Sequence, residues 1–251
     1  MTNIILSGCN GKMGKVITAC ANENDDCRIV AGVDINTEAL SNYPVYSSFS
    51  EITENADVII DFSHPSVLND LLQFAKEKKL PLVLATTGFS ASQTEQIKAV
   101  ANEIPLFFTF NMSLGINLLV ALSKKAAEVL SGNFDIEIIE KHHNQKLDAP
   151  SGTAIMLAEA INDTLDNKMM YEYDRHSKRE KRRDNEIGIH SIRGGNIVGE
   201  HEVIFAGHDE VLTLSHQATS KEVFAVGALK AAMFMNGKSA GLYDMNNVIT
   251  L

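Results

Sequence analysis

The sequence predicts an α/β protein with a doubly wound parallel sheet near the N-terminus and a second α+β domain built on a mixed or antiparallel sheet. Three observations predict this class. Short, nearly continuous apolar segments alternate with segments of helical periodicity, and a glycine-rich turn joins the first apolar segment to the first helical one. Beyond Asn111 the pattern changes to strands of alternating polarity.

The N-terminal part repeats a strand followed by a helix. Buried strands are expected at residues 4–6, 28–33, 57–62, 82–85 and 106–109. Helices are expected at residues 13–21, 66–79 and 91–102. Because connections between parallel strands are right-handed, such a repeat places helices on both faces of one sheet.

The remainder of the chain has a different architecture. Helices are expected at residues 114–130 and 152–165, and strands at 135–140, 187–193, 197–206 and 211–217. The alternation within these strands leaves one face of their sheet solvated or lining a site. A last helix at residues 222–235 is apolar on much of its surface and must pack on something large, but the sequence leaves open which domain receives it.

Composition bounds the class of protein. The chain has 251 residues, 45% of them hydrophobic and 22% charged, and no apolar run approaches the roughly 20 residues of a membrane-spanning helix. The N-terminus carries no basic leader, so we expect a cytoplasmic protein. Cys9, Cys20 and Cys27 have no CxxC spacing and are expected to be reduced thiols. A net charge of −10 argues against a general nucleic-acid binder.

A glycine loop and an acidic residue point to a dinucleotide. Gly8–Gly14 has the spacing GxxGxxG between a strand and a helix, where backbone N–H groups can approach a pyrophosphate. Glycines at such a turn also serve simple close packing, but Asp34 ends the next strand, twenty residues after Gly14, where a carboxylate binds the adenosine ribose. Asp34 disfavours a 2′-phosphate, whereas Lys12 could reach one, so we expect both NADH and NADPH to be usable.

The ends of later strands should meet the same crevice, because ligands bind outside the carboxyl ends of parallel strands. Three of these ends are candidate cofactor contacts. They are Asp61-Phe62-Ser63-His64-Pro65, Ala85-Thr86-Thr87-Gly88 and Thr109-Phe110-Asn111-Met112. In the first of them, Ser63 and Pro65 are also typical of an ordinary helix start.

A polar cluster at residues 140–154 ends one strand and begins a helix. His142 and His143 adjoin on extended chain, so their side chains should point to opposite faces, and no thiol or carboxylate cluster supports a metal site. Unpaired N–H groups at the start of the helix could hold a substrate carboxylate, or the segment could be a plain Ser or Thr cap. Lys146 could neutralise a second negative charge or donate a proton. The cluster predicts a small acidic substrate; a solvated polar loop is the alternative.

The cluster also carries a specific resemblance. Written E-x-H-H-x-x-K-x-D-A-P-S-G-T-A, Glu140–Ala154 resembles the signature of the 4-hydroxy-tetrahydrodipicolinate reductase family, formerly dihydrodipicolinate reductase, of bacterial lysine and diaminopimelate synthesis. Further segments resemble family segments in the same order along the whole chain. They are Gly8–Gly14, Ala85–Gly88, Asn111–Gly115, Ile189–Gly195, Gly199–His201 and Gly241–Met245.

The resemblance implies a Rossmann-type dinucleotide-binding domain at residues 1–112 and 218–251, a substrate-binding and oligomerisation domain at 113–217, and a homotetramer. It implies reduction of a cyclic imine dicarboxylate by NADH or NADPH. The catalytic residues are then His142, as a proton donor or acceptor, and Lys146, as a proton donor, while His143, Gly152 and Thr153 bind substrate. The implied cofactor-binding residues are Gly8, Cys9, Asn10, Gly11, Lys12, Met13, Asp34, Ala85, Thr86, Thr87, Thr109, Phe110, Asn111 and Met112. Many members have a basic residue where this chain has Ile35.

Two other functions fit parts of the pattern. A different nicotinamide-dependent reductase of a small dicarboxylate would share the dinucleotide loop and the anion site. A dinucleotide sensor without turnover would have no need for the histidines and the lysine. The basic run at residues 175–183 is interpreted as a solvated loop, with steering of a dianionic substrate or nucleic-acid binding as alternatives.

Overall fold

The computed structural model describes residues 1–249 of the chain. These residues form two compact units, which we describe separately. Unit 1 comprises Met1–Leu114 together with the segment that begins at Lys221, and unit 2 comprises Gly115–Ser220. Within the described range, no helix is both long enough and apolar enough to cross a membrane.

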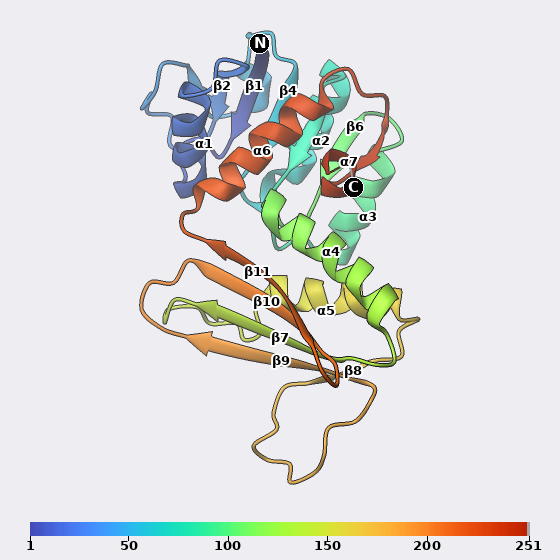
Figure 1. Ribbon diagram of the computed structural model, residues 1–251. Coiled ribbons are helices and arrows are strands. Elements are labelled where there is room, and N and C mark those ends of the chain that lie inside the picture. The colour runs from blue at the N-terminus through green and yellow to red at the C-terminus, as the bar shows by residue number, and fades with distance from the viewer. Residues whose placement is uncertain (250–251) are drawn as a thin grey trace. The chain divides into compact units, whose positions relative to one another are not determined.

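Unit 1 is built on a parallel sheet, and the doubly wound Rossmann-type class is confirmed (Figure 1). Within residues 1–249 the sheet has seven strands in the order β12-β6-β5-β4-β1-β2-β3. The strands are β1 (Thr2–Ser7), β2 (Cys27–Val33), β3 (Val45–Tyr46), β4 (Val58–Asp61), β5 (Leu82–Leu84), β6 (Pro105–Phe108) and β12 (Gly241–Tyr243). The helices are α1 (Lys12–Asn22), α2 (Leu68–Lys78), α3 (Ala91–Val100), α6 (Glu222–Met235) and α7 (Met245–Val248), with short 3₁₀ turns at Phe49–Glu51 and Pro65–Val67.

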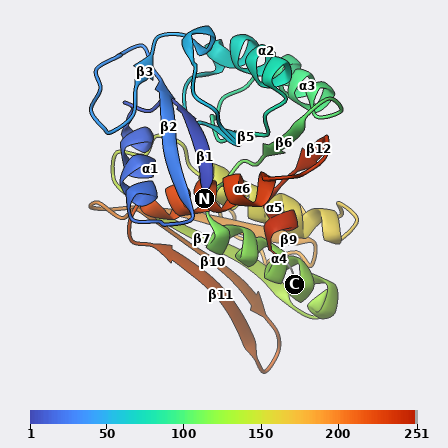
Figure 2. The same ribbon diagram turned by 90° about the horizontal axis from the view of Figure 1, so that it is seen from above.

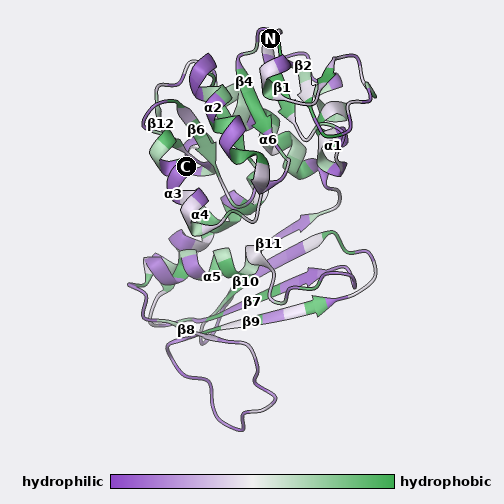
Figure 3. Ribbon diagram, turned by 180° about the vertical axis from the view of Figure 1, so that it is seen from behind, coloured by the Kyte–Doolittle hydropathy of each residue, from purple (hydrophilic) through white to green (hydrophobic). Residues whose placement is uncertain are grey.

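Helices cover both faces of this sheet (Figure 2). On one face α1 and α6 contribute Ile17, Ala228 and Leu229 to a core that includes Ile4 of β1. On the other face α2 and α3 contribute a second core, made by residues such as Leu71, Leu72, Phe74, Ile97 and Val100. The strands between the two layers are hydrophobic, as Figure 3 shows for β1 and β4, because neither of their faces meets water.

Helix α6 packs in unit 1, which answers the question that the sequence left open. It contacts α1 and the strands β1, β4, β5 and β6. Gly227 makes the close approach possible, because a Cβ atom there would lie 1.7 Å from the carbonyl oxygen of Met112. The strand β12 adds to the same sheet beside β6 and was not expected, since three residues are too few to show a period.

A substitution at Gly227 should therefore affect both stability and cofactor binding. We expect Gly227→Ala to lower the free energy of unfolding by about 1–3 kcal/mol, because helix and backbone must move apart. The shift also displaces Met112, one of the residues expected to contact the cofactor, so the Kd for a nicotinamide dinucleotide should rise. Gly241→Ala is the matched control, because a Cβ atom there meets Tyr243 only at 3.4 Å or more. Chemical denaturation and nucleotide titration check both effects, and equal behaviour of the two variants would contradict the argument.

Unit 2 combines two helices with a mixed sheet, as the alternating pattern predicted. Its elements are α4 (Leu114–Leu130), β7 (Asp135–His142), α5 (Gly152–Thr164), β8 (Met170–Glu172), β9 (Glu186–Arg193), β10 (Gly199–Ala206) and β11 (Val211–Ala218). Within the described residues the strand order is β11-β10-β7-β9-β8, with β7 antiparallel to β10 and parallel to β9. The core of unit 2 lies between the helices and one face of the sheet, where Leu119, Ile136, Ile138, Leu157, Ile161, Ile189, Val203 and Phe205 pack together.

Candidate active site

The glycine loop has a backbone path that only glycine permits. Gly8 has φ +77°, and a Cβ atom there would lie 2.5 Å from the carbonyl oxygen of Phe62. At Gly14 a Cβ atom would lie 2.2 Å from the carbonyl oxygen of Gly8. Gly11 is the N-cap of α1 and supplies no side-chain cap, so the first amides of the helix face the loop. This geometry fits a phosphate group at the positive end of α1.

Asp34 is tied directly to that loop. Its Oδ2 accepts a hydrogen bond from the backbone N–H of Asn10 at 2.9 Å, and its Oδ1 accepts one from Asn36 at 3.0 Å. The side chain of Asn10 in turn donates to the carbonyl oxygens of Asn36 and Glu38. The structure thus brings Asp34 beside Gly8–Met13, as the dinucleotide pattern requires. The thiol of Cys9 is buried, so only its backbone can reach a ligand.

A largely apolar cavity of about 240 Å³ lies at the ends of β4, β5 and β6. It is lined by Met13, Phe62, Ala85, Thr87, Thr109, Phe110, Asn111, Met112 and Phe224. All of these except Phe224 lie in segments that were candidate cofactor contacts from the sequence. Phe224 comes from α6, so no pattern near the glycine loop could have indicated it. The size and apolar lining of the cavity suit a planar ring such as nicotinamide.

Thr86 and Thr87 have different environments, which the sequence did not distinguish. Thr87 lines the cavity, whereas Thr86 is buried and donates its hydroxyl to Oδ2 of Asp61 at 2.6 Å. Any contact of Thr86 with a ligand in the cavity would therefore use its backbone. Ser63 also donates to Asp61, at 2.5 Å, and the cap of the following 3₁₀ turn is the His64 ring rather than Ser63.

In unit 2, the polar cluster is organised by a buried carboxylate that sequence reasoning missed. Glu140 is fully buried and accepts two hydrogen bonds from Arg193, at 2.6 and 2.8 Å. It also interacts with Nδ1 of His142 at 2.6 Å and accepts from the Ser151 amide at 3.1 Å. Burial alone would raise the pKa of Glu140, but the hydrogen bonds from Arg193 and His142 outweigh it and lower the pKa from 4.5 to about 2.

The same contacts orient His142. Because Glu140 fixes Nδ1, the opposite nitrogen Nε2 is the one that can meet a ligand. The ring packs edge-on against His201 at 5.2 Å, and Gly199 leaves it room, since a Cβ atom there would lie 3.1 Å from Nε2. Residues 1–249 contain no group of three or more His, Cys, Asp or Glu side chains able to hold a metal ion.

A tight turn after β7 returns Lys146 toward the end of the strand. The amide of Lys146 donates to the carbonyl oxygen of His143 at 3.2 Å. Its ammonium pairs with Asp148 at 2.9 Å, and the side chain is 21% exposed. Such a half-buried amine, held near His142 along the chain, can deliver a proton to a bound molecule.

The N-terminus of α5 completes the cluster. Ser151 is the N-cap, and its hydroxyl accepts from the amide of Ala154 at 3.2 Å. The capping role therefore belongs to Ser151 and not to Thr153. Gly152 is exposed, and a Cβ atom there would meet nothing within 4 Å. The helix start is accessible at Gly152, which suits a substrate carboxylate.

His201 makes unit 2 sensitive to acid. Burial lowers the pKa of His201 from 6.5 to about 4. The residue is only 4% exposed, and its Nε2 lies 3.1 Å from the Ser151 hydroxyl. Between pH 4 and pH 6.5 the His201 ring is protonated in the unfolded chain and neutral in the folded chain. The contribution of the neutral ring to the free energy of unfolding is therefore complete above pH 6.5 and is lost as the pH falls toward 4. The difference corresponds to about 3 kcal/mol.

Urea unfolding of the full chain at pH 7 and pH 5 checks this expectation. Wild type should lose stability on acidification, and His201→Gln should lose less. His208→Gln is the matched control, because the side chain of His208 is 96% exposed. If His201→Gln lost as much free energy of unfolding between pH 7 and pH 5 as wild type, other groups would account for the acid sensitivity.

The basic run at residues 175–183 lies in the long loop between β8 and β9 (Figure 1). Four of its six lysine and arginine side chains pair with carboxylates of the same unit. Arg175 bonds Glu186 at 2.7 Å, Arg182 bonds Asp135 at 2.8 Å, and Lys178 bonds Glu172. Cations that are already paired are poor ligands for phosphate, which favours the solvated-loop interpretation over a nucleic-acid patch.

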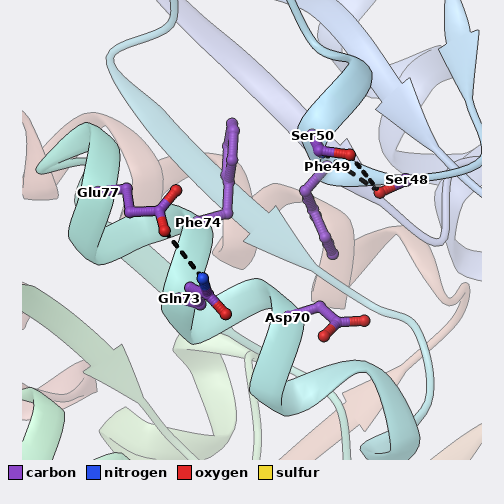
Figure 4. A pocket seen from close by; sticks show the side chains of 7 residues that line it. All are labelled: Ser48, Phe49, Ser50, Asp70, Gln73, Phe74 and Glu77. Carbon is purple, nitrogen blue, oxygen red and sulfur yellow. Dashed lines mark hydrogen bonds between the residues drawn. The ribbon is translucent and has the colours of Figure 1, made fainter.

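Figure 4 shows a second hollow of unit 1, of about 300 Å³, between α2 and the 3₁₀ turn at Phe49–Glu51. Phe49 and Phe74 stack at its base with ring centroids 5.6 Å apart. Gln73 bonds Glu77, and Ser48 bonds Ser50. Four of its polar side chains are thus paired with one another, and none of the predicted site residues lines it.

The chain is similar in sequence to known proteins. Family models match residues 2–112, described as dihydrodipicolinate reductase, N-terminus, and residues 115–249, described as its C-terminus. The 4-hydroxy-tetrahydrodipicolinate reductase of Caldanaerobacter subterraneus subsp. tengcongensis is 55% identical over 249 residues, covering 99% of this chain and 98% of that protein. The reductase of the same name from Clostridium tetani is 51% identical over 248 residues, covering 98% and 96%.

Solved structures agree at the level of the whole chain. Dipicolinate-bound dihydrodipicolinate reductase from Paenisporosarcina sp. TG-14 is 26% identical with a TM-score of 0.83, covering 99% of this chain and 100% of that one. A myo-inositol dehydrogenase from Corynebacterium glutamicum is 17% identical with a TM-score of 0.58, covering 93% and 87%. The second likeness shows a shared fold alone.

Proposed function

The chain belongs to the 4-hydroxy-tetrahydrodipicolinate (dihydrodipicolinate) reductase family, and we propose that it reduces 4-hydroxy-tetrahydrodipicolinate to tetrahydrodipicolinate with NADH or NADPH. In this reaction the substrate loses water and gains a hydride and a proton. The observation that carries the proposal is the arrangement of Glu140, His142 and Lys146 beside the accessible start of α5, in a chain that also holds a dinucleotide loop.

The strand order supports the placement of the cofactor. Asp34 follows β2, the glycine loop follows β1, and the cavity lies at the ends of β4, β5 and β6. These strands adjoin in the sheet order β6-β5-β4-β1-β2. An extended dinucleotide would thus lie with its adenosine at Asp34, its pyrophosphate at Gly8–Met13 and its nicotinamide in the cavity. When bound, the nicotinamide supplies the hydride.

The residues of unit 2 would bind the substrate and move the proton. Gly152 and Thr153 at the start of α5 bind one carboxylate through backbone N–H groups, and His143 contributes to binding. Lys146 donates a proton to the carbon next to the one that receives the hydride. His142, held through Nδ1 by Glu140, presents Nε2 and stabilises the negative charge that develops. A reduction that needs both hydride and proton explains why a lysine and a histidine accompany the anion site.

A direct assay tests the proposal. The purified protein is mixed with NADH or NADPH and the condensation product of pyruvate with aspartate semialdehyde, generated in place by the preceding synthase. Loss of reduced-nicotinamide absorbance is expected, and it should require the synthase. Binding of a nucleotide without turnover would instead favour a sensor, and turnover of another dicarboxylate alone would favour a different reductase.

The cofactor preference follows from Asp34. A 2′-phosphate would lie against its carboxylate, and Ile35 beside it offers no counter-charge, so we expect NADH to give the higher kcat/KM while NADPH remains usable through Lys12. Asp34→Ser should raise kcat/KM for NADPH relative to NADH by about tenfold, the size of one relieved charge contact near a protein surface. Asp26→Ser, which changes an exposed acid before β2, is the control. If Asp34→Ser left the ratio of kcat/KM for NADPH to kcat/KM for NADH unchanged, other residues would determine the cofactor preference.

We also propose a homotetramer and a cytoplasmic location. The face of the unit 2 sheet opposite its helices carries Ile192 and Val211, which are 46% and 63% exposed, and such residues on a sheet face suit contact between copies. The cytoplasm fits a biosynthetic reductase with free thiols. Analytical ultracentrifugation tests the assembly, and a monomer at micromolar concentration would exclude it.

A further inference from the structure

His201 is a buried histidine to which the proposed function assigns no role. It lies on β10, is 4% exposed, and stands directly opposite Glu140 of β7 in the sheet. Its Nε2 lies 3.1 Å from the hydroxyl of Ser151, and its ring packs edge-on against the ring of His142, with centroids 5.2 Å apart. His201 therefore contacts both the N-cap of α5 and the histidine that is expected to face the substrate.

These contacts join four residues into a closed network. Glu140 interacts with Nδ1 of His142 at 2.6 Å and accepts from the amide of Ser151 at 3.1 Å. His201 links His142 to Ser151 on the opposite side of the network. The end of β7, the first half of β10 and the start of α5 are thus held together by side chains. A displacement of His201 would be felt by both His142 and Ser151.

The hydrogen bond between His201 and Ser151 has a defined direction. The oxygen of the Ser151 hydroxyl accepts from the amide of Ala154 at 3.2 Å, which leaves the hydroxyl hydrogen to be donated to Nε2 of His201. Nε2 is then the acceptor, and the proton of the neutral ring is on Nδ1. Burial lowers the pKa of His201 to about 4, and the nearby His142 acts in the same direction, so the ring is neutral at pH 7.

Packing alone does not account for a histidine at this position. Within residues 1–249, the buried Nδ1 of His201 has no hydrogen-bond partner. A buried donor without an acceptor destabilises the folded chain, and an apolar ring of similar size would leave no such donor. The hydrogen bond to Ser151 is the contact that an apolar ring could not make.

We propose that His201 is a positioning residue with two separable contacts: its Nε2 fixes the start of α5, where a substrate carboxylate binds, and its ring fixes the orientation of His142. The inference rests on the proposed function, because it needs a substrate at the start of α5. The first contact should govern KM for the substrate, since it holds the amides that bind the carboxylate. The second should govern kcat, since it holds the ring that stabilises the developing negative charge.

Two substitutions in the full chain separate the contacts. His201→Phe keeps an aromatic ring against His142 and removes the acceptor for Ser151, so KM should rise about two- to tenfold at unchanged kcat, the size of one net hydrogen bond. His201→Gln keeps an acceptor and removes the ring, so kcat should fall about two- to tenfold at unchanged KM, the size of one aromatic contact. The Kd for NADH should be unchanged in both variants, because the dinucleotide loop belongs to unit 1.

His208→Phe is the matched control, because His208 belongs to the same unit and its side chain is 96% exposed. This variant should keep the wild-type kcat and KM. Steady-state kinetics measure both constants, and ¹⁵N NMR of the histidine rings measures the tautomer of His201 in wild type, which we expect to carry its proton on Nδ1. If His201→Phe does not fold, Ser151→Ala removes the same hydrogen bond from the other side and should raise KM in the same way.

The outcomes are distinct. A purely structural residue would lower the free energy of unfolding in both variants and change kcat and KM in the same manner in each. That result, or a neutral His201 with its proton on Nε2, would overturn the inference. A wild-type chain that binds NADH but does not reduce the substrate would instead contradict the proposed function, and the tautomer of His201 would still be measured.

Discussion

Replacing Lys146 by alanine should lower kcat for the reduction by about 10²–10³-fold, the range expected when a positioned proton donor is removed. The Kd for NADH should stay unchanged, because Lys146 belongs to unit 2 and the dinucleotide loop to unit 1. Steady-state kinetics with both cofactors, together with nucleotide titration, measure the two quantities. A deuterated hydride donor would show whether proton delivery has become the slow step.

Lys168→Ala is the matched control for this experiment. Lys168 pairs with Asp166 at 2.8 Å across two positions, much as Lys146 pairs with Asp148 at 2.9 Å, but it lies beyond the far end of α5 and is 73% exposed. Its removal deletes the same charge from unit 2 and should leave kcat unchanged. If both variants retained the wild-type kcat, Lys146 would not be the proton donor.

Replacing Glu140 by alanine should be the most destabilising of these substitutions. The change leaves the Arg193 guanidinium, the His142 ring and the Ser151 amide without the carboxylate that they share. Removing one partner of a buried ion pair costs about 3–5 kcal/mol, and the loss should appear in the unfolding of unit 2. Activity should fall as well, because His142 loses the contact that fixes its ring.

A surface ion pair in the same unit provides the comparison. Glu128 pairs with Lys125 at 3.0 Å on α4, with both side chains more than half exposed, so Glu128→Ala should cost about 0–1 kcal/mol. The conservative Glu140→Gln should recover part of the stability and activity, since an amide oxygen can still accept from His142. Equal costs for Glu140→Ala and Glu128→Ala would show that the buried network contributes little.

Local patterns predicted most of the fold. The strand and helix repeat of unit 1 and the path through Gly8–Gly14 depend on neighbouring residues, so both can be inferred from the sequence. The destination of α6 depends on packing against residues more than 100 positions away, and no local pattern encodes that. The strands β3, β8 and β12 have two or three residues each, too few for any periodicity to be visible.

Of the residues of the candidate site, too, only some could be predicted from the sequence. Asp34 was found from its spacing to the glycine loop, and the structure places it against Asn10. Glu140 had a visible signal that was not used: it continues the apolar face of Ile136 and Ile138, where a charge must have a buried partner. Phe224 had none, because a residue of α6 reaches the cavity only through the tertiary fold. The roles assigned to His142, His143, Lys146 and Thr153 stay predictions until they are tested.

The return of α6 to unit 1 has a consequence for synthesis of the chain. A ribosome releases the strands and helices of the first 114 residues long before α6 emerges, yet Ala225, Ala228, Leu229 and Ala232 cover one face of the sheet that those residues build. Until then Ile4, Leu6 and Val83 lie on a face of the sheet that α6 does not yet cover. We therefore expect the nascent domain to expose apolar surface to which chaperones can bind until α6 has been synthesised, and a chain that terminates between residues 114 and 221 to aggregate instead of forming a stable dinucleotide-binding unit.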